Sequence, residues 1–167
     1  MSFFTRAAHT ALTGLAIFGF ASAAFAHHVE QQPFVETEST LLLDAVRRTG
    51  HQVYGKADIC EEGLLGVATS DKRLLICVDN HKGDMDEMAD TIRHEALHLV
   101  QYCNNGATLM PEENDQFIDY AQEYLHWDIL GYDPSAWSIE AEARVMAHFL
   151  DEHQVAQLLV KYCGGRS

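Results

Sequence analysis

The sequence predicts an α+β fold that is mainly helical, with a small β-hairpin placed directly before one long helix. Apolar side chains recur every three or four residues through most of the chain, which is the spacing of helices that bury one face. Two short apolar and partly β-branched runs, at 64–69 and 73–79, flank the turn-forming residues 70–72, and this pattern predicts the hairpin. The sequence shows no internal repeat, so we expect one domain of ordinary size.

The segments before the hairpin begin with a helix. Ser39 or Thr40 can cap it, because a side-chain oxygen can accept a hydrogen bond from the first free N–H groups. Gly50 ends it, since glycine tolerates the left-handed conformation that follows many helices. After it we expect a short strand at 51–54 and a loop at 58–63.

A long helix follows the hairpin. Asp84 or Asp86 can cap its start, and we expect it to run to about Tyr102. The sequence Asn-Asn-Gly at 104–106 ends it. A further helix is expected over 112–127, with an aromatic and aliphatic face that is more typical of a core than of a ligand site.

Two helices complete the chain. Asp133 and Pro134 form a favourable helix start, with a capping side chain followed by a residue whose fixed φ suits the first turn. This helix is expected over 136–150, and the last one over 152–162.

The first 26 residues have the features of a secretory signal peptide. Arg6 supplies a positive charge, an apolar run follows at 11–20, and Ala24-Phe25-Ala26 fits the small-residue cleavage signal. The apolar run is too short, and too rich in glycine and alanine, for a membrane-spanning helix. We expect cleavage near Ala26, leaving a single mature domain at 27–167 that is exported to the periplasm or secreted.

The chain is strongly acidic, with 25 acidic against 11 basic residues and a formal net charge of −14. The predicted signal peptide holds one arginine and no acid, so its removal makes the mature domain more negative still. Such a surface repels nucleic acid and anionic membranes. We therefore expect no nucleic-acid partner and no membrane association after cleavage, and the sequence gives no indication of an oligomeric state.

The mature domain would contain four cysteines: Cys60, Cys77, Cys103 and Cys163. An even number in an exported protein indicates two disulfides, for which three pairings are possible. We favour Cys60–Cys77, which would tie a loop to a strand, and Cys103–Cys163, which would join the chain end to the end of the long helix. A zinc ribbon is not indicated, because the sequence has no C-x-x-C pair.

The motif H-E-x-x-H lies on the long helix and consists of His94, Glu95 and His98. Residues four apart lie on the same face of a helix, so both imidazoles can point at one metal ion. Glu95 lies beside them, where it can act as general base on a metal-activated water. The neighbouring residues are mostly apolar, which favours a buried site over the alternative of two solvated surface histidines.

A catalytic zinc site needs three protein ligands and one open position. An extended motif would supply a third histidine, but Gln101 and Asn104 occupy the matching positions. The best remaining source is the acidic segment 138–144, through either Glu140 or Glu142. A helical step of two turns a side chain by about 200°, so both carboxylates cannot serve one metal. If neither binds metal, they belong to a solvated helix face.

The two motifs resemble those of the gluzincins, zinc peptidases that combine H-E-x-x-H with a distal glutamate on a second helix. They are most similar to the small single-domain members of that family, the minigluzincins. The second helix in that family often reads E-x-E-A-D-x-x-A, and residues 140–147 here read E-A-E-A-R-V-M-A. The resemblance implies a zincin-like fold in which Glu140 joins His94 and His98 as a Zn²⁺ ligand and Glu95 is the catalytic base.

The resemblance also implies a role for the strand before the motif helix. In zincin-type proteases this strand lines the cleft and pairs with extended substrate, so we expect the run 73–79 to do so by edge-strand addition. A hairpin that serves only the core would have the same sequence.

One position departs from the family pattern. The family's aspartate, four residues after the glutamate ligand, supports the first motif histidine, and Arg144 stands there in this chain. Because a cation cannot accept the imidazole proton, His94 must find another acceptor.

A second electrophile often assists catalysis at such sites. His148 is the first residue to test, since it lies two helical turns beyond Glu140. The residues of suitable type are Tyr102, Tyr124, His126, Tyr132 and His148.

Together these observations predict an exported zinc-dependent metallopeptidase that acts on a peptide or protein substrate. Glu95 would take a proton as water attacks the peptide carbonyl and would deliver it to the leaving amine. The alternative is a non-catalytic exported zinc-binding or structural domain that retains the H-E-x-x-H helix.

Overall fold

The computed structural model describes residues 39–126 and 131–165, so the predicted signal peptide and its cleavage site lie outside the described residues. The fold is α+β, mainly helical with one three-stranded sheet, as predicted. The helices and strands are α2 (Thr40–Arg48), β1 (Gln52–Tyr54), β2 (Gly66–Thr69), β3 (Arg73–Ile76), α3 (Met85–Cys103), α4 (Asn114–Tyr124), α5 (Trp137–Phe149) and α6 (Glu152–Cys163).

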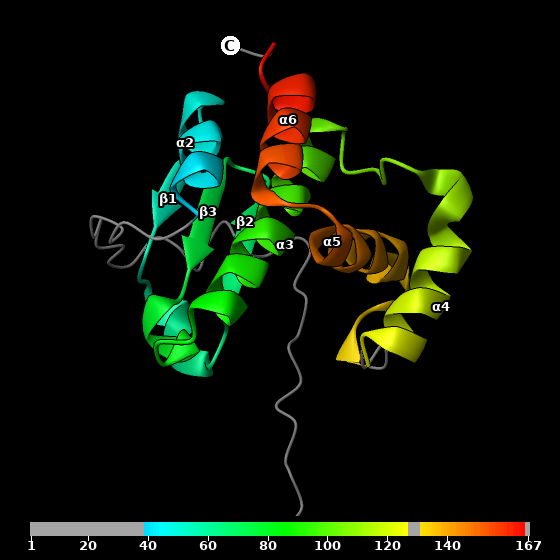
Figure 1. The fold of residues 1–167 in the computed structure, drawn as a ribbon, viewed down its shortest axis with the longest axis horizontal. Helices are drawn as coiled ribbons and strands as arrows, with labels where there is room; N and C mark the ends of the chain where they lie inside the picture. The colour runs from blue at the N-terminus through cyan, green and yellow to red at the C-terminus, as the bar shows by residue number, and fades with distance from the viewer. Residues whose placement is uncertain (1–38, 127–130, 166–167) are drawn as a thin grey trace, which may run out of the picture.

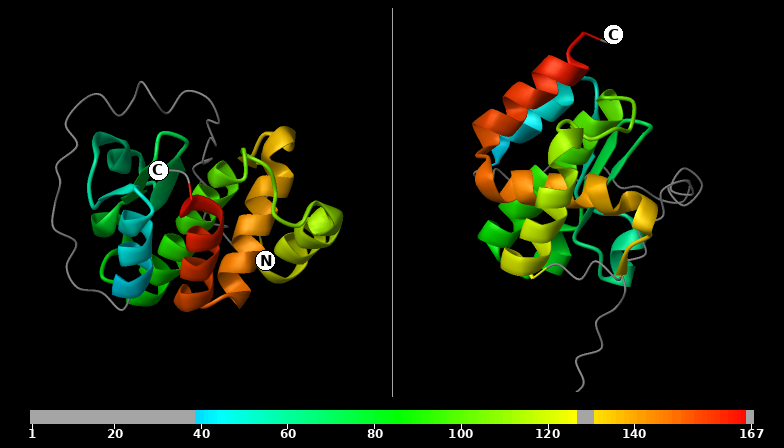
Figure 2. Two further views of the ribbon diagram at one scale, coloured as in Figure 1. Left: turned by 90° about the horizontal axis from the view of Figure 1, so that it is seen from above. Right: turned by 90° about the vertical axis from the view of Figure 1, so that its right-hand side faces the viewer.

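Helix α3 runs through the middle of the molecule and contacts most of the other elements (Figure 1). The sheet and α2 lie on one side of it, while α5 and α4 extend away on the other side. Seen from above, α2, α6, α5 and α4 follow one another across the molecule (Figure 2). The motif helix is therefore held between the sheet and α5.

The sheet has the strand order β1-β3-β2. Strands β2 and β3 pair antiparallel, with Gly66 opposite Ile76, which confirms the predicted hairpin. Strand β1 confirms the short strand expected at 51–54, and it pairs parallel with β3. The expectation that the run 73–79 offers a free edge to substrate is therefore wrong, because β3 is the central strand and β1 and β2 occupy its two sides.

The sheet buries side chains on both of its faces. Leu74 and Ile76 point into the main core, which also contains side chains of α2, α3, α5 and α6. Leu75 points the opposite way, into a smaller cluster with Tyr54 and Cys77. This alternation follows from the two-residue period of a strand, and it explains why these β3 side chains are fully buried.

Two of the predicted capping residues make capping hydrogen bonds, whereas Ser39 at the start of α2 does not, because its hydroxyl donates to Oε1 of Glu152 at 2.6 Å. The Asp84 side chain accepts a hydrogen bond from the backbone N–H of Glu87 at 3.0 Å, so Asp84 rather than Asp86 caps α3. The Asp133 side chain accepts one from the N–H of Ser135 at 2.8 Å, in a short 3₁₀ turn that leads into α5.

The helix expected over 112–127 is shorter than predicted. A 3₁₀ turn begins at Pro111, and α4 follows it. His126 adopts a φ of 52°, a left-handed conformation that cannot continue a helix. Trp127, the last residue of the expected helix, lies outside the described residues.

The loop expected at 58–63 contains a 3₁₀ turn, Asp58–Glu62.

Both predicted disulfides are present. Cys60–Cys77 spans 17 residues and Cys103–Cys163 spans 60 residues, with Cα–Cα distances of 5.4 and 5.3 Å. By restricting the unfolded chain, loops of these lengths stabilise the fold by about 3 and about 4 kcal/mol in the chain-entropy model. The longer loop contains α4, α5 and nearly all of α6, so this disulfide joins the motif helix to the C-terminal half of the domain.

The helices differ in how much of their surface is covered. More than half of the residues of α3 are buried, whereas Ala121 is the one buried residue of α4, which packs chiefly on α5.

None of the helices in the described part of the chain combines the length and the apolar character that crossing a membrane requires.

Candidate metal centre

Helix α3 brings two imidazoles together on one face. His94 and His98 are one turn apart, and their Nε2 atoms lie 3.1 Å from each other. The rings meet edge to face with centroids 4.6 Å apart, and His98 is only 7% exposed. The helical spacing of the motif thus gives two nitrogen atoms that face a common point.

A carboxylate from α5 completes the group. The Oε2 atom of Glu140 lies 3.6 Å from Nε2 of His94 and 3.5 Å from Nε2 of His98. Glu140 is 6% exposed, so the group is largely shielded from water. The structure therefore brings together the three residues that the sequence suggested as metal ligands.

Two hydrogen bonds from α3 side chains to α5 backbone carbonyls help to hold this arrangement. Nε of Arg93 donates to the carbonyl of Ala147 at 3.0 Å. Two turns further along α3, Nε2 of Gln101 donates to the carbonyl of Ile139, also at 3.0 Å. Because the two bonds lie on either side of the histidine pair, they fix α5 across the motif.

The three atoms fit a tetrahedral zinc ion. Bonds of about 2.0–2.1 Å to nitrogen and oxygen would place neighbouring ligand atoms roughly 3.3 Å apart. The observed separations of 3.1, 3.5 and 3.6 Å lie on either side of that value. Two imidazoles and one glutamate are also a ligand set known for catalytic zinc.

Glu142, the alternative ligand, lies elsewhere. Its side chain is fully buried, and its carboxylate accepts hydrogen bonds from the backbone N–H groups of Leu109 and Met110 at 2.8 Å. It also accepts one from Nε2 of Gln101 at 2.8 Å. Glu142 therefore fixes the connection between α3 and α4, and of the two glutamates Glu140 faces the histidines.

Gln101 links this buried carboxylate to the histidine pair. Its amide nitrogen donates to Glu142, so its Oε1 atom is left to accept, and Nδ1 of His98 lies 2.8 Å from it. This bond orients the imidazole and leaves Nε2 as the atom that faces Glu140. The two histidines differ in this respect. Nδ1 of His98 has Gln101 as its acceptor, whereas no described residue accepts a hydrogen bond from Nδ1 of His94.

In the metal-free protein, His98 and Glu140 shift each other's pKa. Burial alone would lower the pKa of His98, but the Glu140 carboxylate outweighs it and raises the pKa to about 9. Burial would likewise raise the pKa of Glu140, yet the charges and hydrogen bonds of His98 and His94 hold it well below its usual range. A buried ion pair therefore occupies the centre when no cation does.

This coupling predicts a pH dependence for the stability of the metal-free protein. The pKa of His98 in the folded state, about 9, exceeds its ordinary value of 6.5. Its contribution is therefore full below pH 6.5 and is lost as pH rises through 9. Urea denaturation with a chelator present should show the free energy of unfolding falling between pH 6.5 and 10. The Glu140→Gln variant serves as control, and an equal decline in that variant would show that another group is responsible.

Glu95 lies between the histidine pair and the outer strand β2. It is 8% exposed. A Cβ atom at Gly66 would lie 2.9 Å from Cγ of Glu95 and 2.8 Å from Cγ2 of Thr91. Glycine at this position therefore lets the β2 backbone pass directly against the general-base candidate.

Of the five residues suggested as a second electrophile, Tyr102 has the clearest link to the centre. It lies one turn beyond His98 on α3. Burial raises the pKa of its phenol to about 12, and the charges of Glu95 and Glu140 contribute to the rise. The phenol therefore keeps its proton at neutral pH and can serve as a hydrogen-bond donor near both carboxylates.

The preference for His148 is not supported. Eight residues of helix separate it from Glu140, which is about 12 Å along the axis. His148 is exposed and its ring contacts those of Tyr120 and Phe149, with centroids 6.4 and 5.0 Å from its own.

Arg144, the departure from the family pattern, is half-buried, and its Nε atom has no hydrogen-bond partner among the described residues.

The sequence did not predict that Gln101 orients His98 or that Glu142 binds the backbone before α4. Gln101 was noted only because it excludes a third histidine, and Glu142 only as a rival ligand. A usable signal existed: a glutamine three residues after His98, inside an apolar helix, must be buried, and a buried amide needs polar partners.

Comparison with known proteins gives one match. A family model described as a domain of unknown function, DUF8637, matches residues 32–164. No curated protein and no solved structure matches the chain.

Proposed function

This chain belongs to the DUF8637 family, and we propose that it is an exported zinc-dependent metallopeptidase of the gluzincin type, with a zincin-like fold. The observation that carries the proposal is the convergence of His94, His98 and Glu140, whose ligand atoms lie within 3.6 Å of one another. Glu95 follows His94 directly in the sequence, as a general base must. The signal-peptide features and two disulfides favour an exported location.

The chemistry is divided among few residues. When bound by His94, His98 and Glu140, Zn²⁺ supplies a Lewis acid that activates water and polarises the peptide carbonyl. Glu95 accepts the proton that the attacking water loses and donates it to the leaving amine nitrogen. Tyr102 donates a hydrogen bond to the carbonyl oxygen as negative charge develops on it.

The outer strand β2 offers a place for substrate beside Glu95. Among the described strands, β2 has β3 as its neighbour on one side and none on the other. An extended peptide can add to such an edge through backbone hydrogen bonds. Because Gly66 of β2 lies against Glu95, a peptide on this edge would run close to the metal centre.

Zinc content and hydrolysis together test the proposal. The mature protein should contain one zinc per chain, cleave members of a mixed peptide library read by mass spectrometry, and lose cleavage reversibly with a chelator. The His94→Ala variant should lose both zinc and cleavage. The His153→Ala variant, whose histidine is exposed on α6, should keep both. A zinc content near zero in the folded mature protein would overturn the proposal.

The Tyr102→Phe variant should lose turnover without losing zinc. Removing one donor to a developing oxyanion lowers kcat by about 100-fold, whereas KM should change little. Steady-state kinetics on one cleaved peptide, with zinc analysis of the same sample, checks this. Tyr162→Phe on α6 is the matched control and should behave as the unaltered protein. Unchanged kcat in Tyr102→Phe would assign the phenol a packing role only.

The alternative is an exported domain that keeps zinc without turnover. The observation that favours it is Arg144, which stands where the related family has an aspartate, so that none of the described residues gives Nδ1 of His94 a carboxylate acceptor. One zinc per chain with no cleavage of any peptide in the library would select this alternative.

A further inference from the structure

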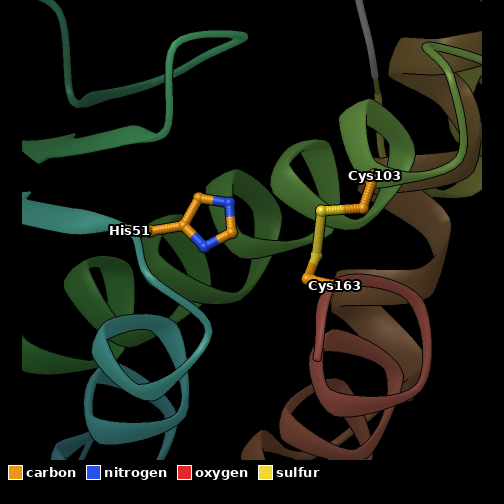
Figure 3. A group of neighbouring side chains, drawn as sticks. All are labelled: His51, Cys103 and Cys163. Atoms are coloured by element: carbon orange, nitrogen blue, oxygen red, sulfur yellow. A yellow bond between two sulfur atoms is a disulfide. The ribbon is translucent and has the colours of Figure 1, made fainter. Parts of the chain in front are cut away.

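A second group of potential metal ligands lies away from the histidine pair and involves the Cys103–Cys163 disulfide (Figure 3). His51 immediately precedes β1, Cys103 is the last residue of α3, and Cys163 is the last residue of α6. One imidazole nitrogen and the two sulfur atoms all lie within 4.8 Å of one another. The imidazole points from β1 toward the disulfide.

The hydrogen bonds of His51 fix which of its nitrogens is free to bind. Its Nδ1 atom lies 3.0 Å from Oγ1 of Thr49. That hydroxyl directs its only proton to the carbonyls of Val46 and Ala45, at 2.8 and 3.1 Å, so it accepts from Nδ1–H of His51. Nε2 therefore carries the lone pair, and an outer hydrogen bond at Nδ1 is what metal-binding histidines usually have.

Most of this group is shielded from water. The His51 side chain is 6% exposed and Cys163 is 5% exposed, so two of the three side chains lie inside the fold.

We propose that His51, Cys103 and Cys163 form a second metal site, which binds Zn²⁺ when the disulfide between the two cysteines is reduced. A dithiol reductant supplies two electrons and two protons, breaks the S–S bond and itself becomes a disulfide. The two thiols then release their protons as their sulfurs bind the metal, and Nε2 of His51 is the third ligand. The site does not depend on the function proposed for the histidine pair.

The geometry requires only a small rearrangement. Two thiolates on tetrahedral zinc, with Zn–S bonds of about 2.3 Å, lie roughly 3.7 Å apart. The two Cα atoms are 5.3 Å apart, so side-chain rotation alone can separate the sulfurs by that amount. Two cysteines and one histidine leave a fourth position for water, a known zinc ligand set.

The other disulfide provides a comparison within the same chain. Cys60–Cys77 has no histidine or carboxylate that completes such a group among the described residues. A site that arose simply from reducing any disulfide would form there equally well. The proposed site should form at only one of the two.

Cobalt titration tests the proposal, because absorption from thiolate-to-Co²⁺ charge transfer reports cysteine ligands and is blind to the His94, His98 and Glu140 group. The mature protein is titrated with Co²⁺ in the oxidised state and after reduction by a phosphine, with circular dichroism to follow folding. We expect the band only after reduction, saturating with one equivalent of Co²⁺ beyond the cation that His94, His98 and Glu140 hold, and displaced by Zn²⁺. The Cys60→Ser/Cys77→Ser variant should retain it.

Two variants separate a built site from adventitious thiol binding. His51→Ala should abolish the band at stoichiometric Co²⁺. Thr49→Val removes the outer hydrogen bond and should weaken binding by about 10- to 100-fold. No band in the reduced and folded chain, a band that His51→Ala leaves unchanged, or loss of the helical signal on reduction would each overturn the proposal.

Discussion

Replacing Glu95 by glutamine is expected to lower peptide hydrolysis by about 10²- to 10⁴-fold, the range that general acid–base catalysis contributes. The amide has the shape of the carboxylate but cannot accept the proton of the attacking water. Zinc should stay bound, because His94, His98 and Glu140 are unchanged. The measurement is kcat/KM on one cleaved peptide, together with zinc analysis of the same sample.

The control for this variant is Asp86→Asn, which changes an exposed carboxylate in the first turn of the same helix and should leave hydrolysis unaltered. Full activity in Glu95→Gln would remove Glu95 from the mechanism. Loss of zinc together with activity would indicate that Glu95 supports the site structurally, since its side chain lies against Gly66 of β2.

The Glu142→Ala variant should show a large loss of stability. Removing the carboxylate leaves the N–H groups of Leu109 and Met110 without their acceptor inside the fold, and Nε2 of Gln101 keeps only the carbonyl of Ile139. We expect the free energy of unfolding to fall by about 3–5 kcal/mol, because each buried donor left without an acceptor costs about 1–3 kcal/mol. Urea denaturation followed by circular dichroism measures it.

Asp119→Ala on α4 is the matched comparison, because that carboxylate is exposed and its loss should change stability by about 0.5 kcal/mol or less. Zinc affinity gives a second reading of the Glu142 variant. Gln101 loses one of the two acceptors of its amide and holds His98 less firmly, so affinity should fall even under conditions where the variant is folded. A loss below 1 kcal/mol would mean that the 104–111 connection finds other partners.

Local patterns in the sequence predicted much of the fold. The four-residue spacing of His94 and His98 determines their common face whatever the rest of the chain does, and the capping carboxylates of Asp84 and Asp133 act within their own turns. The favoured disulfide pairing is also confirmed, although the sequence allowed three pairings and did not decide among them.

Contacts between distant segments were the part that sequence could not supply. Strand β1 is three residues long, and nothing in those residues specifies a parallel partner 21 positions later. Because the pairing of β1 with β3 was not foreseen, β3 was expected to be an edge strand. Similarly, Glu140 and Glu142 differ by a helical rotation, and only the placement of α5 on α3 decides which carboxylate meets the histidines and which meets the 107–110 backbone.

Local opening of the molecule is expected to begin at α4. A segment opens at a lower free energy when it buries few side chains, and α4 buries Ala121 alone while packing on Ala141 and Val145 of α5. Its amide hydrogens should therefore exchange with solvent sooner than those of α3. Such an excursion would uncover the side of α5 that packs on α4 while the sheet and the histidine-bearing helix stay folded, so the first opening of the molecule and its global unfolding would be separate events.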